Sequence, residues 1–168
     1  MATIPAGAGA GDVKQALLSS YKAGDKSYRV NLDGYNLVPF LTGQSPASPR
    51  REFVYFSDDG DLVGLRYDNW KFVYAQQRAA GTFAVWVEPF VKTRIPLIFN
   101  LRTDPYERAT ITSNTYWDWM MERSYLREYA SKIIKDFLTT FKEYPPRQRP
   151  ASFTIDQMVE NLQKSLAK

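Results

Sequence analysis

The feature that most constrains the fold is a series of short apolar runs separated by tight turns. The runs cover residues 53–56, 62–67, 70–75, 83–87 and 97–101. Asp58, Asp59 and Gly60 form a turn signal after the first run, and prolines follow the last two. Parallel strands need connections of a dozen or more residues, which these gaps do not provide. The pattern therefore predicts an antiparallel sheet of four or five short strands.

Helical signals lie on both sides of these runs. Residues 13–23 are expected to form a short helix, with Asp12 as its cap and Gly24 after its end. A long helix is expected from Asn114 or Thr115 to Pro145, because apolar residues recur every four positions: Met121, Tyr125, Tyr129, Ile133, Phe137 and Phe141. A final amphipathic helix follows a capping-box spacing at residues 154–157 and carries Ile155, Met158, Val159, Leu162 and Leu166 on its apolar side.

These elements predict an α+β fold, in which a small four- to five-stranded antiparallel sheet packs against the long helix and a C-terminal amphipathic helix follows. Residues 1–12 are rich in glycine and alanine and are expected to form a flexible leader. Residues 13–168 are expected to form a single domain. The sequence shows neither an export signal nor an apolar stretch of the ~20 residues that span a membrane.

The composition excludes several kinds of chemistry. The chain contains no cysteine and no histidine, so it has no thiolate or imidazole to act as nucleophile, base or metal ligand. The net charge of +4 is spread along the chain, which argues against a nucleic-acid partner. Trp70, Phe72 and Tyr74 alternate on one strand face and are expected to be core residues rather than a surface for stacking bases. Either a reducing or an oxidising compartment fits the absence of cysteine.

Three further groups invite a functional interpretation. Asp58, Asp59 and Asp61 lack the spacing of a calcium loop and are expected to form a turn. Asp104 and Glu107 are expected to belong to a turn and a helix cap rather than to an acid–base pair. The apolar start of the long helix includes Trp117 and Trp119, and two alternatives stay open there: ordinary core and contact with another protein.

Three segments resemble arylsulfatases. Residues 32–43 (LDGYNLVPFLTG) resemble the D-G-x-x-L-x-P-x-L-x-G stretch that follows the catalytic domain of that family. Residues 65–71 (LRYDNWK) resemble its arginine-to-W-K hairpin, and residues 99–107 (FNLRTDPYE) are similar to its Y-N-L-x-x-D-P-x-E strand and turn. With residues 144–153, the likeness extends from about residue 21 almost to the end of the chain.

The resemblance implies a C-terminal subdomain of an arylsulfatase, a small antiparallel sheet with a helix that packs against an alkaline-phosphatase-like domain. The family hydrolyses sulfate esters with a formylglycine, made within a C/S-x-P-x-R motif, and a calcium ion. Neither Ser45 nor Ser48 fits that motif, so no catalytic or metal residue is carried over and the chain alone is expected to be inactive, with no cofactor of its own. The expected partner is a sulfatase catalytic domain or a second copy of the chain. The candidate framework and interface residues are Asp33, Gly34, Arg66, Trp70, Lys71, Asp104, Pro105, Glu107, Trp117 and Trp119.

Overall fold

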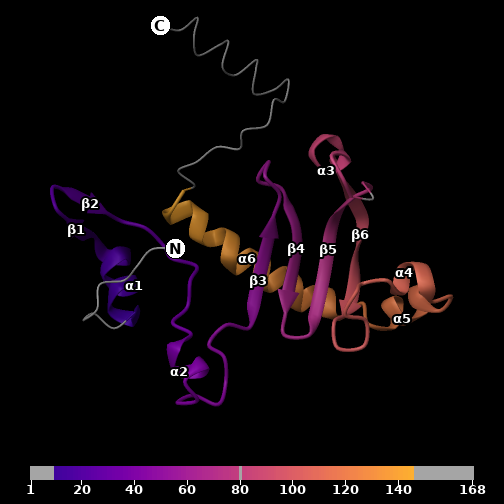
Figure 1. Cartoon of the computed structure of the whole chain (residues 1–168), viewed down its shortest axis with the longest axis horizontal. Coiled ribbons are helices and arrows are strands. Elements are labelled where there is room, and N and C mark those ends of the chain that lie inside the picture. The colour runs from indigo at the N-terminus through magenta and orange to yellow at the C-terminus, as the bar shows by residue number, and fades with distance from the viewer. Residues whose placement is uncertain (1–9, 80, 146–168) are drawn as a thin grey trace, which may run out of the picture.

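Four antiparallel strands form the centre of the fold, as the short connections predict. The computed structural model describes residues 10–79 and 81–145. Its main sheet has the order β3-β4-β5-β6, with bounds Glu52–Phe56, Leu62–Tyr67, Trp70–Gln77 and Phe90–Asn100 (Figure 1). Gly60 (φ 82°) and Asp68 (φ 50°) take the left-handed conformation in the two turns that connect β3, β4 and β5. The predicted meander is therefore confirmed.

The register of the sheet places its apolar side chains on defined faces. Leu65 pairs with Phe72, and Phe72 pairs with Ile98, so these three buried residues share one face. The helix α6 (Leu126–Glu143) crosses this face in Figure 1 and adds the buried residues Ala130 and Ile134 to the core. The aromatic residues of β5 belong to this core as predicted, since Phe72 is buried and Trp70 and Tyr74 pack against it.

The long C-terminal helix is broken, which corrects the prediction of one continuous helix. Helix α5 (Tyr116–Glu122) ends at Arg123, whose guanidinium donates a hydrogen bond to the carbonyl oxygen of Trp119 at 2.9 Å. Helix α6 then begins at Leu126. The four-residue apolar spacing nevertheless continues through the break, although Met121, Tyr125 and Tyr129 on either side of it are exposed. Periodicity alone therefore could not reveal the interruption.

The N-terminal elements also differ from the prediction. Helix α1 (Ala10–Ser19) starts before Asp12, which therefore occupies a position inside the helix rather than the predicted cap position. Residues 21–23, expected to be helical, form strand β1 (Tyr21–Ala23), which pairs with β2 (Lys26–Tyr28). Gly24 (φ 61°) makes the tight turn between these strands instead of ending a helix. The one-turn helix α2 (Val38–Leu41) follows before the main sheet.

Residues 83–87 were predicted to be a strand, and this prediction is wrong. The chain turns at Gly81 (φ 98°) and Thr82 (φ 62°) and forms the one-turn helix α3 (Ala84–Val87). Strand β6 begins only at Phe90, and helix α4 (Ala109–Thr112) follows it. The Gln77 side chain holds α3 in place, a tertiary contact that an apolar run does not disclose.

Two other predictions fall beyond the described residues. Residues 1–9 of the predicted leader lie outside them, as does the predicted final helix that follows residue 154. Among the helices of residues 10–79 and 81–145, none combines the length and apolar character needed to cross a bilayer.

Candidate functional site

Two of the segments singled out in the sequence meet at one corner of the sheet. The Lys71 ammonium donates a hydrogen bond to Glu107 Oε1 at 2.6 Å, and it lies 5.3 Å from the centre of the Tyr55 ring. Nearby, the Leu101 amide donates to the Asn69 carbonyl oxygen at 2.7 Å. Both charged side chains of the ion pair are mostly shielded from solvent. These contacts join the β4–β5 hairpin to the turn that follows β6.

The Asp104 carboxylate organises that turn. Its two oxygens accept hydrogen bonds from the backbone amides of Arg108 at 3.0 Å and Ala109 at 2.8 Å, at the start of α4. Pro105 lies exposed within the turn, and Glu107 takes a left-handed conformation (φ 56°). Asp104 therefore binds amides within the turn and at the start of α4, as expected for a turn and cap residue, whereas the Glu107 side chain binds Lys71 of β5.

Arginine side chains hold the neighbouring β4–β5 turn. Arg51 donates to both carboxylate oxygens of Asp68, and these hydrogen bonds lower the pKa of Asp68. Arg66 Nε donates a hydrogen bond to the backbone carbonyl oxygen of Asp68 at 3.1 Å. Asp68 is therefore fixed through its side chain and its backbone. This arrangement gives Arg66 a framework contact within the chain.

Stacked aromatic rings connect the corner to α5. The Trp119 ring lies 6.1 Å from that of Trp70 and 6.0 Å from that of Tyr116. The Tyr116 hydroxyl accepts from the Ile98 amide at 3.2 Å and donates to the Ile98 carbonyl at 3.0 Å. Because β6 is an edge strand, these bonds satisfy backbone groups that no further strand reaches. Burial raises the pKa of the Tyr116 hydroxyl.

The two tryptophans of α5 thus have different surroundings. Trp119 is half-buried against the core, whereas Trp117 is exposed beside Tyr116. The ordinary-core alternative fits Trp119. Trp117 remains available for contact with another surface.

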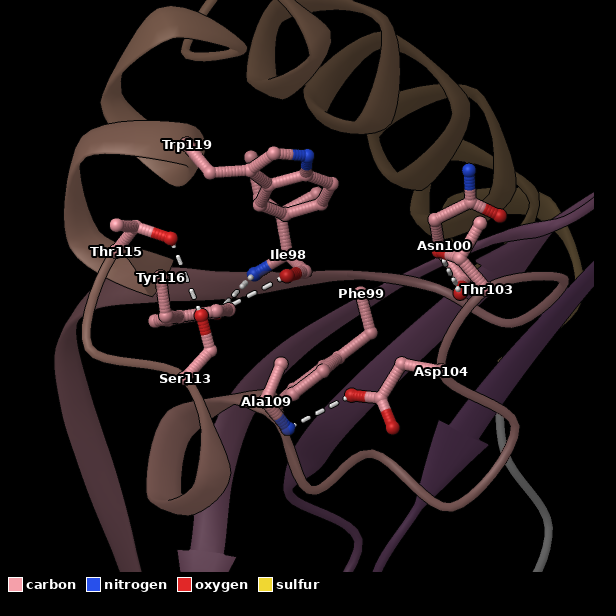
Figure 2. A pocket seen from close by; sticks show the side chains of 10 residues that line it. All are labelled: Ile98, Phe99, Asn100, Thr103, Asp104, Ala109, Ser113, Thr115, Tyr116 and Trp119. Carbon is pink, nitrogen blue, oxygen red and sulfur yellow. Dashed lines mark hydrogen bonds between the residues drawn. The ribbon is translucent and has the colours of Figure 1, made fainter.

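A pocket of about 210 Å³ lies beneath the start of α5 (Figure 2). Its polar groups already have partners: Asn100 Oδ1 accepts from the Arg102 amide at 3.1 Å, and the Ser113 and Thr115 hydroxyls lie 3.3 Å apart. The rings of Tyr116 and Trp119 are stacked on their neighbours. The lining therefore stabilises the fold, and its groups are already used within the chain. Its residues are Ile98, Phe99, Asn100, Thr103, Asp104, Ala109, Ser113, Thr115, Tyr116 and Trp119.

Asp33 and Gly34 lie away from this corner. Asp33 lines a groove of about 450 Å³ between the N-terminal loop, β3 and α6. Next to it, the Tyr35 hydroxyl donates to Glu52 at 2.9 Å, and this hydrogen bond raises the pKa of Tyr35. A Cβ atom on Gly34 would meet no heavy atom within 4 Å. Nothing in the described contacts explains why glycine occupies that position.

The sequence analysis missed two exposed apolar surfaces. In α2, which buries no residue, Val38 is 60% exposed and Leu41 is 75% exposed. In the connection between β5 and β6, Phe83 is 76% exposed and Trp86 is 79% exposed. For the second surface, the available signal was Gly81, which lies two residues before the apolar run at 83–87 and is typical of a turn.

Acidic side chains do not converge within the described part of the chain. Residues 10–79 and 81–145 contain no group of three or more His, Cys, Asp and Glu side chains placed to hold a metal ion. The aspartates near Gly60 form the expected turn, in which the Ser57 carbonyl accepts from the Gly60 amide at 3.0 Å.

The chain has matches among known protein families and among solved structures. The family model for the C-terminal region of aryl-sulfatase matches residues 48–166, more than two thirds of the chain. No curated protein sequence matches the chain significantly. Among solved structures, the chain is similar to the PsFucS1 sulfatase from Pseudoalteromonas sp., with 24% identity and a TM-score of 0.44. That match covers 61% of this chain and 19% of the other, so the chain spans about a fifth of the length of that protein.

Proposed function

Because the chain belongs to the family of aryl-sulfatase C-terminal regions, we propose that it is a non-catalytic module that docks on a sulfatase catalytic domain and supports its fold. The family match supports the statement that the chain is a C-terminal module of a sulfatase. The docking role is supported by the apolar side chains that are exposed in the structure of residues 10–79 and 81–145. A cofactor belongs, on this proposal, to the catalytic domain and not to this chain.

The observation that carries the docking role is the exposed strip at residues 37–41. It follows Asp33 and Gly34, in the segment that resembles the family's link to its catalytic domain. Val38 and Leu41 are among its most exposed side chains, and α2 buries none. Exposed apolar patches of this kind are typical of protein contacts. We therefore assign this strip to the interface with the catalytic domain.

The corner formed by Lys71, Glu107, Asp104 and Trp70 has a different part in the proposal. Each of these side chains has a partner within the chain, and together they fix the turns of the sheet. On this proposal, these side chains keep the module rigid, so that its docking surface is already formed before it binds the catalytic domain. Preformed surfaces lose less conformational entropy on binding.

The proposal is tested by producing an aryl-sulfatase catalytic region without its own C-terminal region, alone and together with this chain. The catalytic region should be taken from an aryl-sulfatase whose own C-terminal region contains the same three segments as this chain. We expect co-production to increase soluble catalytic region, to give co-elution in size exclusion, and to restore hydrolysis of an aryl sulfate. The chain alone should show no hydrolysis. Separate elution and unchanged activity would contradict the proposal.

Self-association is the alternative that the same strip supports. In a homodimer, residues 37–41 of one copy would cover an apolar surface of the other. Light scattering on the chain alone distinguishes self-association from docking. Self-association predicts that the mean mass rises from that of one chain towards that of two chains as the chain concentration increases. A Leu41→Lys substitution would then restore the monomer, since a buried unpaired charge is costly.

A further inference from the structure

The connection between β5 and β6 carries a second apolar surface, which we call the α3 knob: Phe83, Val85, Trp86, Val87 and Phe90. All five side chains are exposed. Figure 1 shows α3 at the far end of the β5–β6 hairpin, whereas α4 and α5 lie beyond the opposite end of β6. The knob is therefore separate from the sheet corner and from the pocket beneath α5.

The backbone of the knob is fixed, although its side chains face solvent. Gln77 Nε2 donates to the carbonyl oxygens of Val85 at 2.7 Å and Glu88 at 2.6 Å, which uses both hydrogens of its amide. Thr82 has a φ of 62°, a conformation that residues other than glycine rarely adopt. Gln77 also pairs with Phe90, the final pair of the β5–β6 ladder. The apolar side chains are thus presented on a prearranged turn.

We infer that the α3 knob is the anchor that inserts into an apolar pocket of the sulfatase catalytic domain. This inference rests on the proposed function and names the part of the chain that makes the contact. Rigid aromatic side chains that fill pockets are the usual energetic centres of protein interfaces. A fixed turn favours a protein pocket of defined shape as the occupant. A lipid surface has no defined shape, so binding to lipid would gain nothing from a turn that is held rigid.

Area and charge further define the occupant. Phe83 and Trp86 together present on the order of 300 Å². A stable interface takes roughly 800 Å² from each partner, so the knob is too small to hold a dimer by itself and fits one part of a larger contact. Arg78 directly follows β5, and Arg94 lies on β6, which leads away from the knob. The pocket that receives the knob should therefore have an apolar floor and an acidic rim.

The test compares Trp86→Ala with Tyr106→Ala in the full chain. Tyr106 is an equally exposed aromatic residue (84%) in the turn beyond the other end of β6. Binding to the aryl-sulfatase catalytic region is measured as a dissociation constant for each chain. We expect Trp86→Ala to weaken binding more than about tenfold and Tyr106→Ala to change it less than about threefold. Trp86→Phe should keep most of the affinity. Because Trp86 is exposed, all three variants should unfold at the wild-type temperature.

Four results would overturn the inference. If the wild-type chain binds and Trp86→Ala binds equally well, the knob is not the anchor, while the docking function stands. If the wild-type chain does not bind at all, the docking function fails and the knob assignment fails with it. The other two results apply if the chain does not bind the catalytic region. Binding of the wild-type chain, but not of Trp86→Ala, to phosphatidylcholine–phosphatidylglycerol vesicles would show that the knob contacts a membrane. A wild-type dimer that becomes a monomer in Trp86→Ala would show that the knob contacts a second copy of the chain.

Discussion

At the residue scale, the side chains singled out by the family resemblance act on one another. Lys71 contacts Glu107, Asp104 caps the start of α4, and Trp70 stacks on Trp119. The sequence shows that these residues occur in recognisable segments, but it does not show their partners. A contact between positions 71 and 107 depends on the tertiary arrangement of β5 and β6. Asp33 and Gly34, from the segment at residues 32–43, lie elsewhere in the fold.

The Lys71–Glu107 ion pair should contribute measurably to stability. Replacing Lys71 with Met removes one partner of a mostly shielded pair and leaves the Glu107 carboxylate without its donor. We expect the free energy of unfolding to fall by about 1–3 kcal/mol, measured by urea denaturation. Lys92, whose ammonium lies 3.7 Å from Asp61 and is well exposed, is the matched control. Lys92→Met should change stability by less than about 0.5 kcal/mol. Equal effects of the two substitutions would contradict the structural role of Lys71.

The half-buried Tyr74 and the buried Tyr116 predict a loss of stability at alkaline pH. Burial raises the pKa of Tyr74 to about 12, above its ordinary value of 10.0. The folded chain therefore retains a proton that the unfolded chain loses between these values. The resulting stabilisation is complete below pH 10 and disappears as the pH approaches 12. Tyr116, whose pKa burial also raises, acts in the same direction.

Urea denaturation at a series of pH values measures this effect. Tyr74 should add a slope of at most about −1.4 kcal/mol per pH unit to the free energy of unfolding above pH 10. The Tyr74→Phe variant should show a shallower decline than the wild-type chain. Identical slopes would show that the Tyr74 hydroxyl does not titrate differently in the folded and unfolded states.

At the element scale, the predictable parts of the fold are those determined by local pattern. The strand at residues 62–67 and the turns at Gly60 and Asp68 follow from a short apolar run and from turn chemistry, and the structure contains them. The one-turn helix α3 and the break between α5 and α6 instead involve hydrogen bonds from a side chain to backbone carbonyl oxygens. Gln77 holds α3 across the hairpin, and Arg123 binds the Trp119 carbonyl at the end of α5. Neither contact leaves a periodic signal in the sequence.

Gln77 is expected to control the order of α3 without controlling the whole fold. A Gln77→Met substitution keeps the length of the side chain and removes both hydrogen bonds to the turn. We expect faster amide hydrogen exchange at residues 84–88, with an unchanged midpoint of global unfolding. Gln76→Met, at the exposed neighbouring position, is the control and should leave exchange as in the wild-type chain. Unchanged exchange in Gln77→Met would show that the turn holds its shape without this amide.

At the scale of the whole molecule, the family could be predicted from three short segments, and the match over residues 48–166 confirms it. The α+β architecture followed from the same sequence by independent physical reasoning, and the structure confirms that too. The exposed surfaces could not be predicted. Residues 37–41 and the α3 knob are apolar runs, which sequence reasoning assigns to the core unless the tertiary fold places them outside.

The central claim is that this chain is a docking module for a sulfatase catalytic domain. Its most direct measurement is the mass of the species formed when the chain and an aryl-sulfatase catalytic region are mixed, determined by light scattering during size exclusion. We predict a single peak whose mass is the sum of one chain of 19.3 kDa and one catalytic region. Two peaks with the masses of the separate proteins would contradict the claim.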